Sequence, residues 1–471
     1  MLNLNLKRVL PYAFLVLIAV ACSTSENDKK GPDSRQLAIS ENKRFLAVGD
    51  NKPFFWLGDT GWLLFGRLTR EEAEKYLENR KQKGFNVVQV MVLHTLGAAN
   101  VYGDSALVGK NIATPKLTEG SSFSDSTQYD FWDHVDFVID KAAEKGIYMA
   151  LVPLWGNNVK SKRVNQERAK AYAEFIANRY KNRPNIIWLD GGDIKGSDSL
   201  DVWKTIGRTI NQIDSTHLIT FHPRGRASSS EWFHNEPWLD FNMVQSGHKS
   251  YAQDTSAKDR WHYGEDNWRY MQADLVLKPT KPVIDGEPSY EQIPYGLHNP
   301  KDPRWTADDV RRYGYWSVLA GAFGYTYGHN SIMQFYKKGD KKSSFGAIDD
   351  WTKALDAPGA GQMIHLKNLM LAHSFFDRVP GQSLIANQGS KYDYLVASRG
   401  PDYALVYTYT GRNIKLNMGK LPGDAVAASW FSPRDGKTTA IGDVANKSVQ
   451  EFNPPAEPKN GNDWVLVIEK K

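Results

Sequence analysis

PVIDGEPSYE, residues 282–291, is a short apolar run that ends in a charged cluster. Its apolar residues are followed by Asp285 and Glu287, and Pro288 ends the strand. Such a run is typical of a parallel strand buried on both faces, and barrel enzymes hold their chemistry just past the carboxyl ends of these strands. Glu287 alone is only a polar strand end. A second carboxylate at a matching strand end makes it a catalytic candidate.

Strand-like and helical patterns alternate on both sides of this stretch. With the opening stretch itself, the expected strands cover residues 54–59, 85–93, 147–155, 185–193, 218–222, 241–248 and 322–329. The helical patterns cover residues 69–83, 131–145, 166–182, 199–213, 266–277, 306–321 and 363–373. Eight strands in such alternation predict an α/β fold closed as a (β/α)8 TIM barrel. An open doubly wound sheet is the alternative, but GDTGW at 58–62 does not match its GxGxxG loop.

Two smaller all-β segments flank the barrel pattern. Residues 37–48 and 53–57 are strand-like around the turn signal GDNK, which predicts a hairpin at the start of a barrel domain spanning residues 36–380. Residues 381–471 change to short alternating strands and predict a small antiparallel β-sandwich. The tyrosines of one of these strands form either an exposed binding strip or, as we favour, a covered sheet face: Tyr403, Tyr407 and Tyr409.

The first 22 residues have the features of a lipoprotein signal peptide. Lys7 and Arg8 precede an apolar stretch, 9–21, and the only cysteine, Cys22. The sequence AVAC resembles a bacterial lipobox, which implies lipidation of Cys22 and a membrane anchor. Residues 23–35 are polar and predict a disordered tether. We therefore expect a protein secreted across the inner membrane and lipid-anchored, facing the periplasm or the cell surface; a soluble secreted protein is the alternative.

Composition narrows the function classes. The net charge of +6 falls to +4 without Lys7 and Arg8, and no long basic run remains, so nucleic acid binding is not supported. Aromatic residues make up 12% of the chain, as a cleft that stacks sugar rings needs. The sequence contains no HExxH, no cysteine pair, no calcium loop and no GxSxG, so we expect no metal, no cofactor and no serine nucleophile.

The second carboxylate is Asp193. It follows the fourth strand in the sequence WLDGGD, while Glu287 follows the seventh, and these two positions face each other across a barrel mouth. Glycoside hydrolysis uses one protonated carboxyl group to donate a proton and one ionised carboxylate to attack; a separation of about 5 Å fits retention and about 6.5–9.5 Å fits inversion. Asp190, inside the same motif, is expected to be a structural hydrogen-bonding residue.

Four motifs in order resemble the apiosidase-like glycoside hydrolases of gut Bacteroidetes, a family within a retaining (β/α)8 clan: FFWLGDTGW, WLDGGD, GEPSYE and SWFSPRDG. The resemblance covers nearly the whole mature chain and includes a C-terminal β domain. It implies that Asp193 is the acid/base and Glu287 the nucleophile. The sequence departs from the common clan pattern because GGD stands where many members have an Asn-Glu pair.

The resemblance also implies a glycan substrate, with apiose-containing side chains of the pectin rhamnogalacturonan II as the specific expectation. Two alternatives stay open: the same machinery acting on another furanoside or a hexose polymer, and a non-catalytic glycan-binding surface lipoprotein.

Polar and aromatic residues near other strand ends are candidates for substrate binding, because they can hydrogen-bond hydroxyl groups or stack on a sugar ring. For any single histidine a structural role is equally expected. The set is Asp59, His94, Trp155, His222, Gln245, His248, Tyr327 and His329. Three further acidic residues are predicted to be loop charges or helix caps without a role in the site: Glu265, Asp266 and Glu291.

Overall fold

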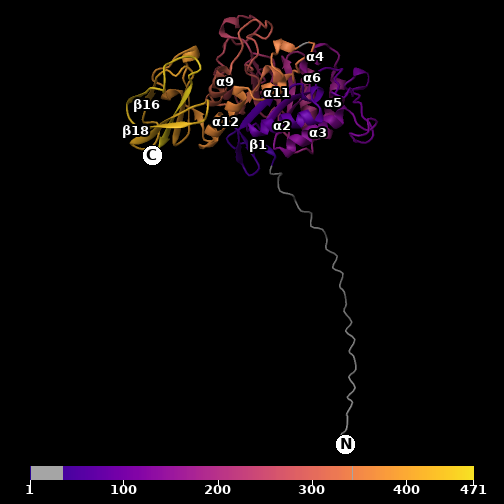
Figure 1. Cartoon of the computed structure of the whole chain (residues 1–471), viewed down its shortest axis with the longest axis horizontal. Coiled ribbons are helices and arrows are strands. Elements are labelled where there is room, and N and C mark those ends of the chain that lie inside the picture. The colour runs from indigo at the N-terminus through magenta and orange to yellow at the C-terminus, as the bar shows by residue number, and fades with distance from the viewer. Residues whose placement is uncertain (2–34, 342) are drawn as a thin grey trace.

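The computed structural model describes Met1, residues 35–341 and residues 343–471 (Figure 1). Apart from Met1 and Arg35, the predicted signal peptide with Cys22 and the predicted tether lie outside the described residues. No helix in the described part of the chain is long and apolar enough to cross a membrane.

The centre of the large domain is a barrel of eight parallel strands, as predicted. Every residue of these strands is buried except Asp193, because helices cover the outside of the barrel while side chains fill its interior. The strands are β4 (Trp56–Thr60), β5 (Val87–Leu93), β6 (Tyr148–Leu154), β7 (Ile186–Ile194), β8 (Ile219–Pro223), β10 (Asn242–Gln245), β11 (Val283–Asp285) and β12 (Gly324–Tyr327). β12 pairs with β4, so the sheet curves back on its first strand.

The ring closes between β8 and β10 without a continuous ladder in the described chain. The backbone N–H of Asp240 donates to the carbonyl of Ile219 at 2.8 Å, and the Thr220 hydroxyl donates to the carbonyl of Phe241 at 2.6 Å. A short strand that the sequence did not predict, β9 (Ala227–Ser228), pairs antiparallel with β10.

The helices begin where the capping residues predict. Thr69 and Glu72 form a capping box at the start of α2, and Asp130 caps α3 in the same way. The long helices are α2 (Arg70–Gln82), α3 (Phe131–Glu144), α5 (Gln166–Tyr180), α6 (Leu200–Ile213), α8 (Trp268–Leu275), α9 (Ala307–Leu319) and α12 (Pro358–Leu371). Short helices stand in the connections: α1 (Leu64–Arg67), α4 (Gly156–Lys160), α7 (Ser230–Phe233), α10 (Asn330–Met333) and α11 (Trp351–Ala354). α12 begins five residues earlier than predicted, because Pro358 suits the first turn of a helix.

Antiparallel strands precede and follow the barrel. The predicted N-terminal hairpin is a three-stranded sheet of β1 (Leu37–Ile39), β2 (Leu46–Val48) and β3 (Lys52–Phe54). The C-terminal domain contains a six-stranded and a two-stranded sheet. Its strands are β13 (Val379–Pro380), β14 (Val396–Arg399), β15 (Tyr403–Thr408), β16 (Ile414–Asn417), β17 (Ala425–Phe431), β18 (Thr438–Ala445), β19 (Val449–Phe452) and β20 (Trp464–Lys470).

The C-terminal domain packs on the barrel through α9 (Figure 1). Tyr407 of β15 stacks on Tyr315 of α9 with ring centroids 4.9 Å apart. Tyr403 and Tyr409 are also buried, so this strand presents a covered face and not an exposed binding strip. The favoured interpretation of these tyrosines is therefore confirmed.

All three acidic residues that we expected to be loop charges or caps are buried: Glu265, Asp266, which pairs with Arg269 in the first turn of α8, and Glu291. Glu265 forms an ion pair with Arg312 at 2.7 Å and accepts a hydrogen bond from Tyr392 of the C-terminal domain. Glu291 accepts hydrogen bonds from the Tyr327 hydroxyl and from the backbone of Gly359. Glu265 and Glu291 both lie in loops, as predicted, but they are buried, and buried charges of this kind are kept only with partners that satisfy them.

Candidate active site

A cleft of about 280 Å³ opens at the carboxyl ends of the barrel strands and holds both predicted catalytic carboxyl groups. Asp193 comes from the end of β7, and Glu287 lies two residues past the end of β11. Aromatic rings form much of its wall: Trp62, Trp155, Tyr290 and Phe345. Flat rings beside paired carboxyl groups are what a sugar-binding cleft requires.

Glu287 is buried and held by two histidines. The Nε2 atom of His248 lies 3.2 Å from Oε1 of Glu287, and Nε2 of His222 lies 3.1 Å from Oε2. Burial by itself raises the pKa of this carboxyl group, but the two imidazoles outweigh burial and lower the pKa to about 2. Glu287 is therefore ionised throughout the working pH range of an enzyme.

Asp193 stands on a bend that the sequence GGD makes possible. Gly191 and Gly192 both have positive φ. A Cβ atom at Gly191 would lie 2.7 Å from the carbonyl oxygen of His222, and one at Gly192 would lie 2.5 Å from the Trp155 ring, so neither position accepts a side chain without a shift. Asp193 itself has φ of 49°, a conformation that non-glycine residues adopt at a cost. The register of β7 against β8 shifts here, so the bend turns Asp193 into the cleft.

The environment of Asp193 favours its protonated form. Water reaches the residue through the open cleft, yet protein surrounds the carboxyl group closely enough that desolvation raises its pKa, and the negative charge of Glu287 raises it further, to about 6. Nearby histidines oppose this shift only in part.

His222 contacts both Asp193 and Glu287. The backbone N–H of Asp193 donates to its Nδ1 atom at 3.4 Å, which leaves Nε2 to face Glu287. Trp62 packs edge-on against the same ring at a centroid distance of 5.2 Å. His222 is fully buried and does not line the cleft, so this predicted binding residue contacts the two carboxylate residues and not the cavity itself.

The structure brings four other predicted binding residues to the cleft: His94, Trp155, Gln245 and His248. The other three predicted binding residues, Asp59, Tyr327 and His329, do not line the cleft. Their side chains point into the layer between the strands and the helices. Asp59 is buried, accepts a hydrogen bond from Tyr76 at 2.6 Å and pairs with Arg80, both on α2. Tyr327 donates to Glu291 at 2.7 Å, and His329 caps α10 by accepting from the backbone of Ser331.

Several cleft residues were missed by sequence reasoning. The Trp62 indole donates to the Tyr290 hydroxyl at 3.1 Å, and Tyr290 packs against His248 at a centroid distance of 4.6 Å. Asn157 and Phe345 complete the wall. Trp62 and Tyr290 lie inside two of the motifs quoted above, and their positions in those motifs could have predicted a place in the cleft. Phe345 follows no strand and lies in no motif, so nothing in the sequence indicated its place.

A model described as "Apiosidase-like, catalytic domain" matches residues 40–377 of the chain. The chain belongs to the apiosidase-like family. The C-terminal domain of this apiosidase-like protein matches a second model, described as "Putative collagen-binding domain of a collagenase", over residues 379–469. The family resemblance drawn from the four motifs is thus confirmed.

Solved structures agree with this assignment. A structure described as a glycoside hydrolase shares 47% sequence identity, covers 93% of the apiosidase-like protein and 97% of its own chain, and gives a TM-score of 0.87. A glycoside hydrolase family 5 structure from Bacteroides vulgatus ATCC 8482 shares 45% sequence identity. It covers 92% of the apiosidase-like protein and 93% of its own chain, and its TM-score is also 0.87. None of the curated proteins matches. The apiosidase-like protein is therefore a glycoside hydrolase.

Proposed function

We propose that this glycoside hydrolase is a retaining enzyme that releases apiose from side chains of rhamnogalacturonan II. One observation carries the hydrolytic mechanism, while retention is what the family resemblance implies: two carboxyl groups in one cleft have pKa values shifted in opposite directions, with Asp193 raised to about 6 and Glu287 lowered to about 2. The opposite pKa shifts support Asp193 as the acid and Glu287 as the ionised carboxylate, which attacks the sugar in a retaining enzyme.

Each carboxyl group then has a defined part in the reaction. Protonated Asp193 donates its proton to the glycosidic oxygen while Glu287 attacks the anomeric carbon, so the glycosidic bond breaks and a glycosyl ester forms. Ionised Asp193 next takes a proton from water, whose oxygen attacks the same carbon and frees Glu287. His222 and His248 hold the Glu287 carboxylate in place through both steps.

The family description supports apiose as the sugar. The test is a screen of the purified protein against pectic and hemicellulosic glycans, with the released sugars identified by chromatography. Free apiose from rhamnogalacturonan II is the expected result. Release of another pentose or of a hexose would overturn the apiose assignment in favour of a related glycosidase, and binding without any release would overturn the enzymatic proposal.

Retention has its own test. The first product detected by proton NMR, before mutarotation, should have the anomeric configuration of the substrate. The opposite anomer would show that Glu287 activates water and does not attack the sugar.

We also propose that the protein is exported and lipid-anchored through Cys22. Mass spectrometry of the mature N-terminus should show a diacylated or triacylated cysteine, and Cys22→Ser should move the protein from the membrane fraction to the soluble fraction. An unmodified Cys22, or an uncleaved N-terminus, would contradict this proposal.

A further inference from the structure

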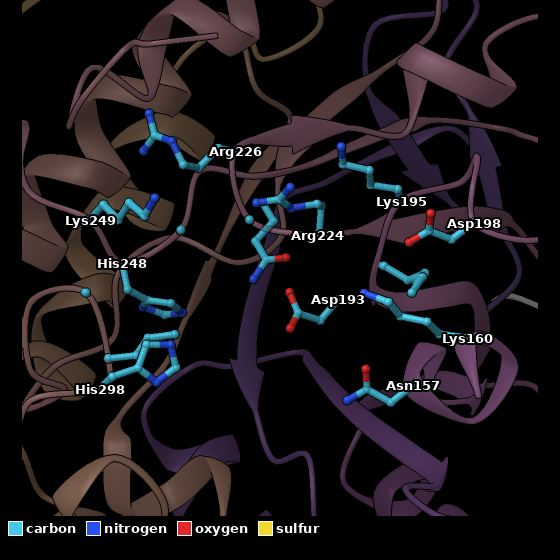
Figure 2. A pocket seen from close by; sticks show the side chains of 16 residues that line it. Asn157, Lys160, Asp193, Lys195, Asp198, Arg224, Arg226, His248, Lys249 and His298 are labelled. Atoms are coloured by element: carbon cyan, nitrogen blue, oxygen red, sulfur yellow. The ribbon is translucent and has the colours of Figure 1, made fainter. Parts of the chain in front are cut away.

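A segment of the barrel domain that forms part of the active site is supported by the C-terminal domain. This segment, residues 246–253, follows β10 and supplies His248, which pairs with Glu287. In Figure 2, His248 projects toward Asp193 in a second cavity, of about 340 Å³, that adjoins the catalytic cleft. The position of His248 therefore depends on how residues 246–253 are held.

Glu265 holds the far end of this segment. Its Oε1 atom accepts a hydrogen bond from the backbone N–H of Tyr251 at 3.1 Å, at the start of the 3₁₀ helix η2 (Tyr251–Gln253). Only two residues separate Tyr251 from His248. Because three residues of chain span at most about 11 Å, a shift of Tyr251 is passed on to His248.

The Glu265 carboxylate is buried at the domain interface, where it needs partners to offset the loss of water. Arg312 of α9 pairs with its Oε2 atom at 2.7 Å. The Tyr392 hydroxyl of the C-terminal domain lies 3.0 Å from Oε1 and 3.1 Å from Oε2. The Tyr392 ring also packs edge-on against Tyr251 at a centroid distance of 5.5 Å. The C-terminal domain thus supplies one of the donors that hold Glu265 and one of the rings that hold Tyr251.

The neighbouring arginine of α9 makes a parallel contact with the same domain. Arg311 pairs with Asp463 at 2.9 Å, and the Tyr407 hydroxyl donates to the same carboxylate at 3.1 Å. Asp463 and Tyr407 both belong to the C-terminal domain, so this cluster attaches the domain to α9. The cluster of Tyr392 differs because its carboxylate, Glu265, belongs to the connection between β10 and α8 of the barrel.

We propose that the C-terminal domain holds the active site in its working geometry, with Tyr392 as a positioning residue. Tyr392 acts through Glu265 and the backbone of Tyr251 on His248, and so on the orientation of the Glu287 carboxylate. In the described chain Tyr392 lines neither of the two cavities, so its effect on the substrate passes through these other residues. The inference rests on the proposed role of Glu287 as the attacking carboxylate.

Barrel residues also hold His248, so the expected effect is moderate. The His248 carbonyl oxygen accepts hydrogen bonds from the backbone of Gly296 at 2.8 Å and from the Trp305 indole at 3.2 Å. Tyr392→Phe removes one hydroxyl group and keeps the ring. Steady-state assays should show kcat lowered roughly three- to tenfold with KM unchanged, as the loss of one hydrogen bond to a charged group allows.

Tyr407→Phe is the matched control, because it removes the hydroxyl group of the parallel cluster in the same domain. It should leave kcat unchanged, and thermal unfolding checks that both variants are folded. Equal kcat values in Tyr392→Phe and Tyr407→Phe would overturn the proposal. In a His248→Gln background, Tyr392→Phe should cause no further loss, since the tyrosine acts through that histidine; a fully additive loss would overturn the proposed path.

Hydrogen exchange tests the same coupling without turnover. Mass spectrometry should show faster amide exchange of residues 246–253 in Tyr392→Phe than in the wild type, and no change there in Tyr407→Phe. Unchanged exchange in Tyr392→Phe would overturn the proposal. Failure of the proposed function is distinguishable, because a protein that releases no sugar from any glycan still shows whether Tyr392 holds this segment. Turnover that is equal in the two tyrosine variants contradicts only the present inference.

Discussion

Glu287 and Asp193 share one cleft but are built in opposite ways. Glu287 is buried, lies just past a regular strand and is held at both oxygens by imidazoles. Asp193 is open to the cleft and stands on a bend with positive φ at three successive residues. Local structure thus sets the two pKa values on either side of the ordinary carboxyl range, and the difference between the two environments assigns the chemical roles.

The largest expected effect comes from removing the nucleophile. Glu287→Gln keeps the size of the side chain and its contact with the histidines but cannot attack the anomeric carbon, so kcat should fall on the order of 10⁵-fold. Steady-state assays with an activated aryl glycoside of the sugar released in the glycan screen measure this loss.

Azide separates a nucleophile from a structural carboxylate. With Glu287→Ala, azide can enter the vacated space and attack the anomeric carbon itself, so part of the activity should return as a glycosyl azide. Full activity in Glu287→Ala without azide would contradict the assignment.

Asp193→Asn should cost less, about 10²–10⁴-fold in kcat/KM on natural substrate, because it removes general acid catalysis but leaves the nucleophile intact. The loss should shrink for an activated aryl leaving group, which departs without protonation. Equal losses on both kinds of substrate would show that Asp193 acts on binding and not as the acid.

The two pKa values also define a pH profile. Activity requires ionised Glu287, which holds above about pH 2, and protonated Asp193, which holds below about pH 6. The expected kcat/KM profile is therefore bell-shaped with an acidic optimum, and at pH 8 it should lie roughly 100-fold below the maximum, since each unit above the upper pKa costs about tenfold. A profile flat from pH 5 to pH 8 would contradict the role of Asp193.

The low pKa of Glu287 depends on its histidine partners. His248→Gln replaces one imidazole, so the acidic limb of the pH profile should move upward by about one unit. His94 lines the same cleft but forms no hydrogen bond or ion pair with Glu287 in the described chain, which makes His94→Gln the matched control with an unchanged acidic limb. Equal shifts in both variants would contradict the coupling between His248 and Glu287.

The fold and the meeting of the two carboxyl groups in one cleft were predictable from the sequence for one physical reason. Buried parallel strands leave continuous apolar runs, and a carboxylate directly after such a run must lie at the mouth of the barrel, as both Glu287 and Asp193 do. A residue's position near the end of a strand does not show whether its side chain points into the barrel or toward the helices, since successive side chains on a strand alternate between the two faces.

Asp59 illustrates this limit. It is the penultimate residue of β4 and lies in a family motif, yet it points outward to Tyr76 and Arg80 of α2, because its register places it on the helix-facing side. Two lysines that line a second cavity beside Asp193 escaped prediction for a different reason. Lys160 ends the short helix α4 and Lys195 follows the GGD bend, so only the three-dimensional path of two connections brings them together.

The smallest expected effect is on stability, and the two carboxyl groups should act in opposite directions. The pKa of Asp193 rises from 3.8 to about 6 in the folded protein, so folding disfavours its ionised form at pH 7 and the penalty disappears below about pH 3.8. Asp193→Asn should therefore stabilise the protein at pH 7, by no more than about 1 kcal/mol because solvent reaches the residue.

The pKa of Glu287 falls from 4.5 to about 2, so its ionised form contributes stability above pH 4.5 that is lost as the pH falls through 2. Glu287→Gln should lower the free energy of unfolding at pH 7 by about 1–3 kcal/mol. Thermal unfolding at pH 7 and pH 3 measures both changes. The gain in Asp193→Asn must vanish at pH 3, where wild-type Asp193 is protonated in the folded and unfolded states alike. If Asp193→Asn still raises the free energy of unfolding at pH 3, the gain comes from relief of backbone strain at the bend. That result would remove the electrostatic explanation for why one carboxyl group acts as an acid and the other as a nucleophile.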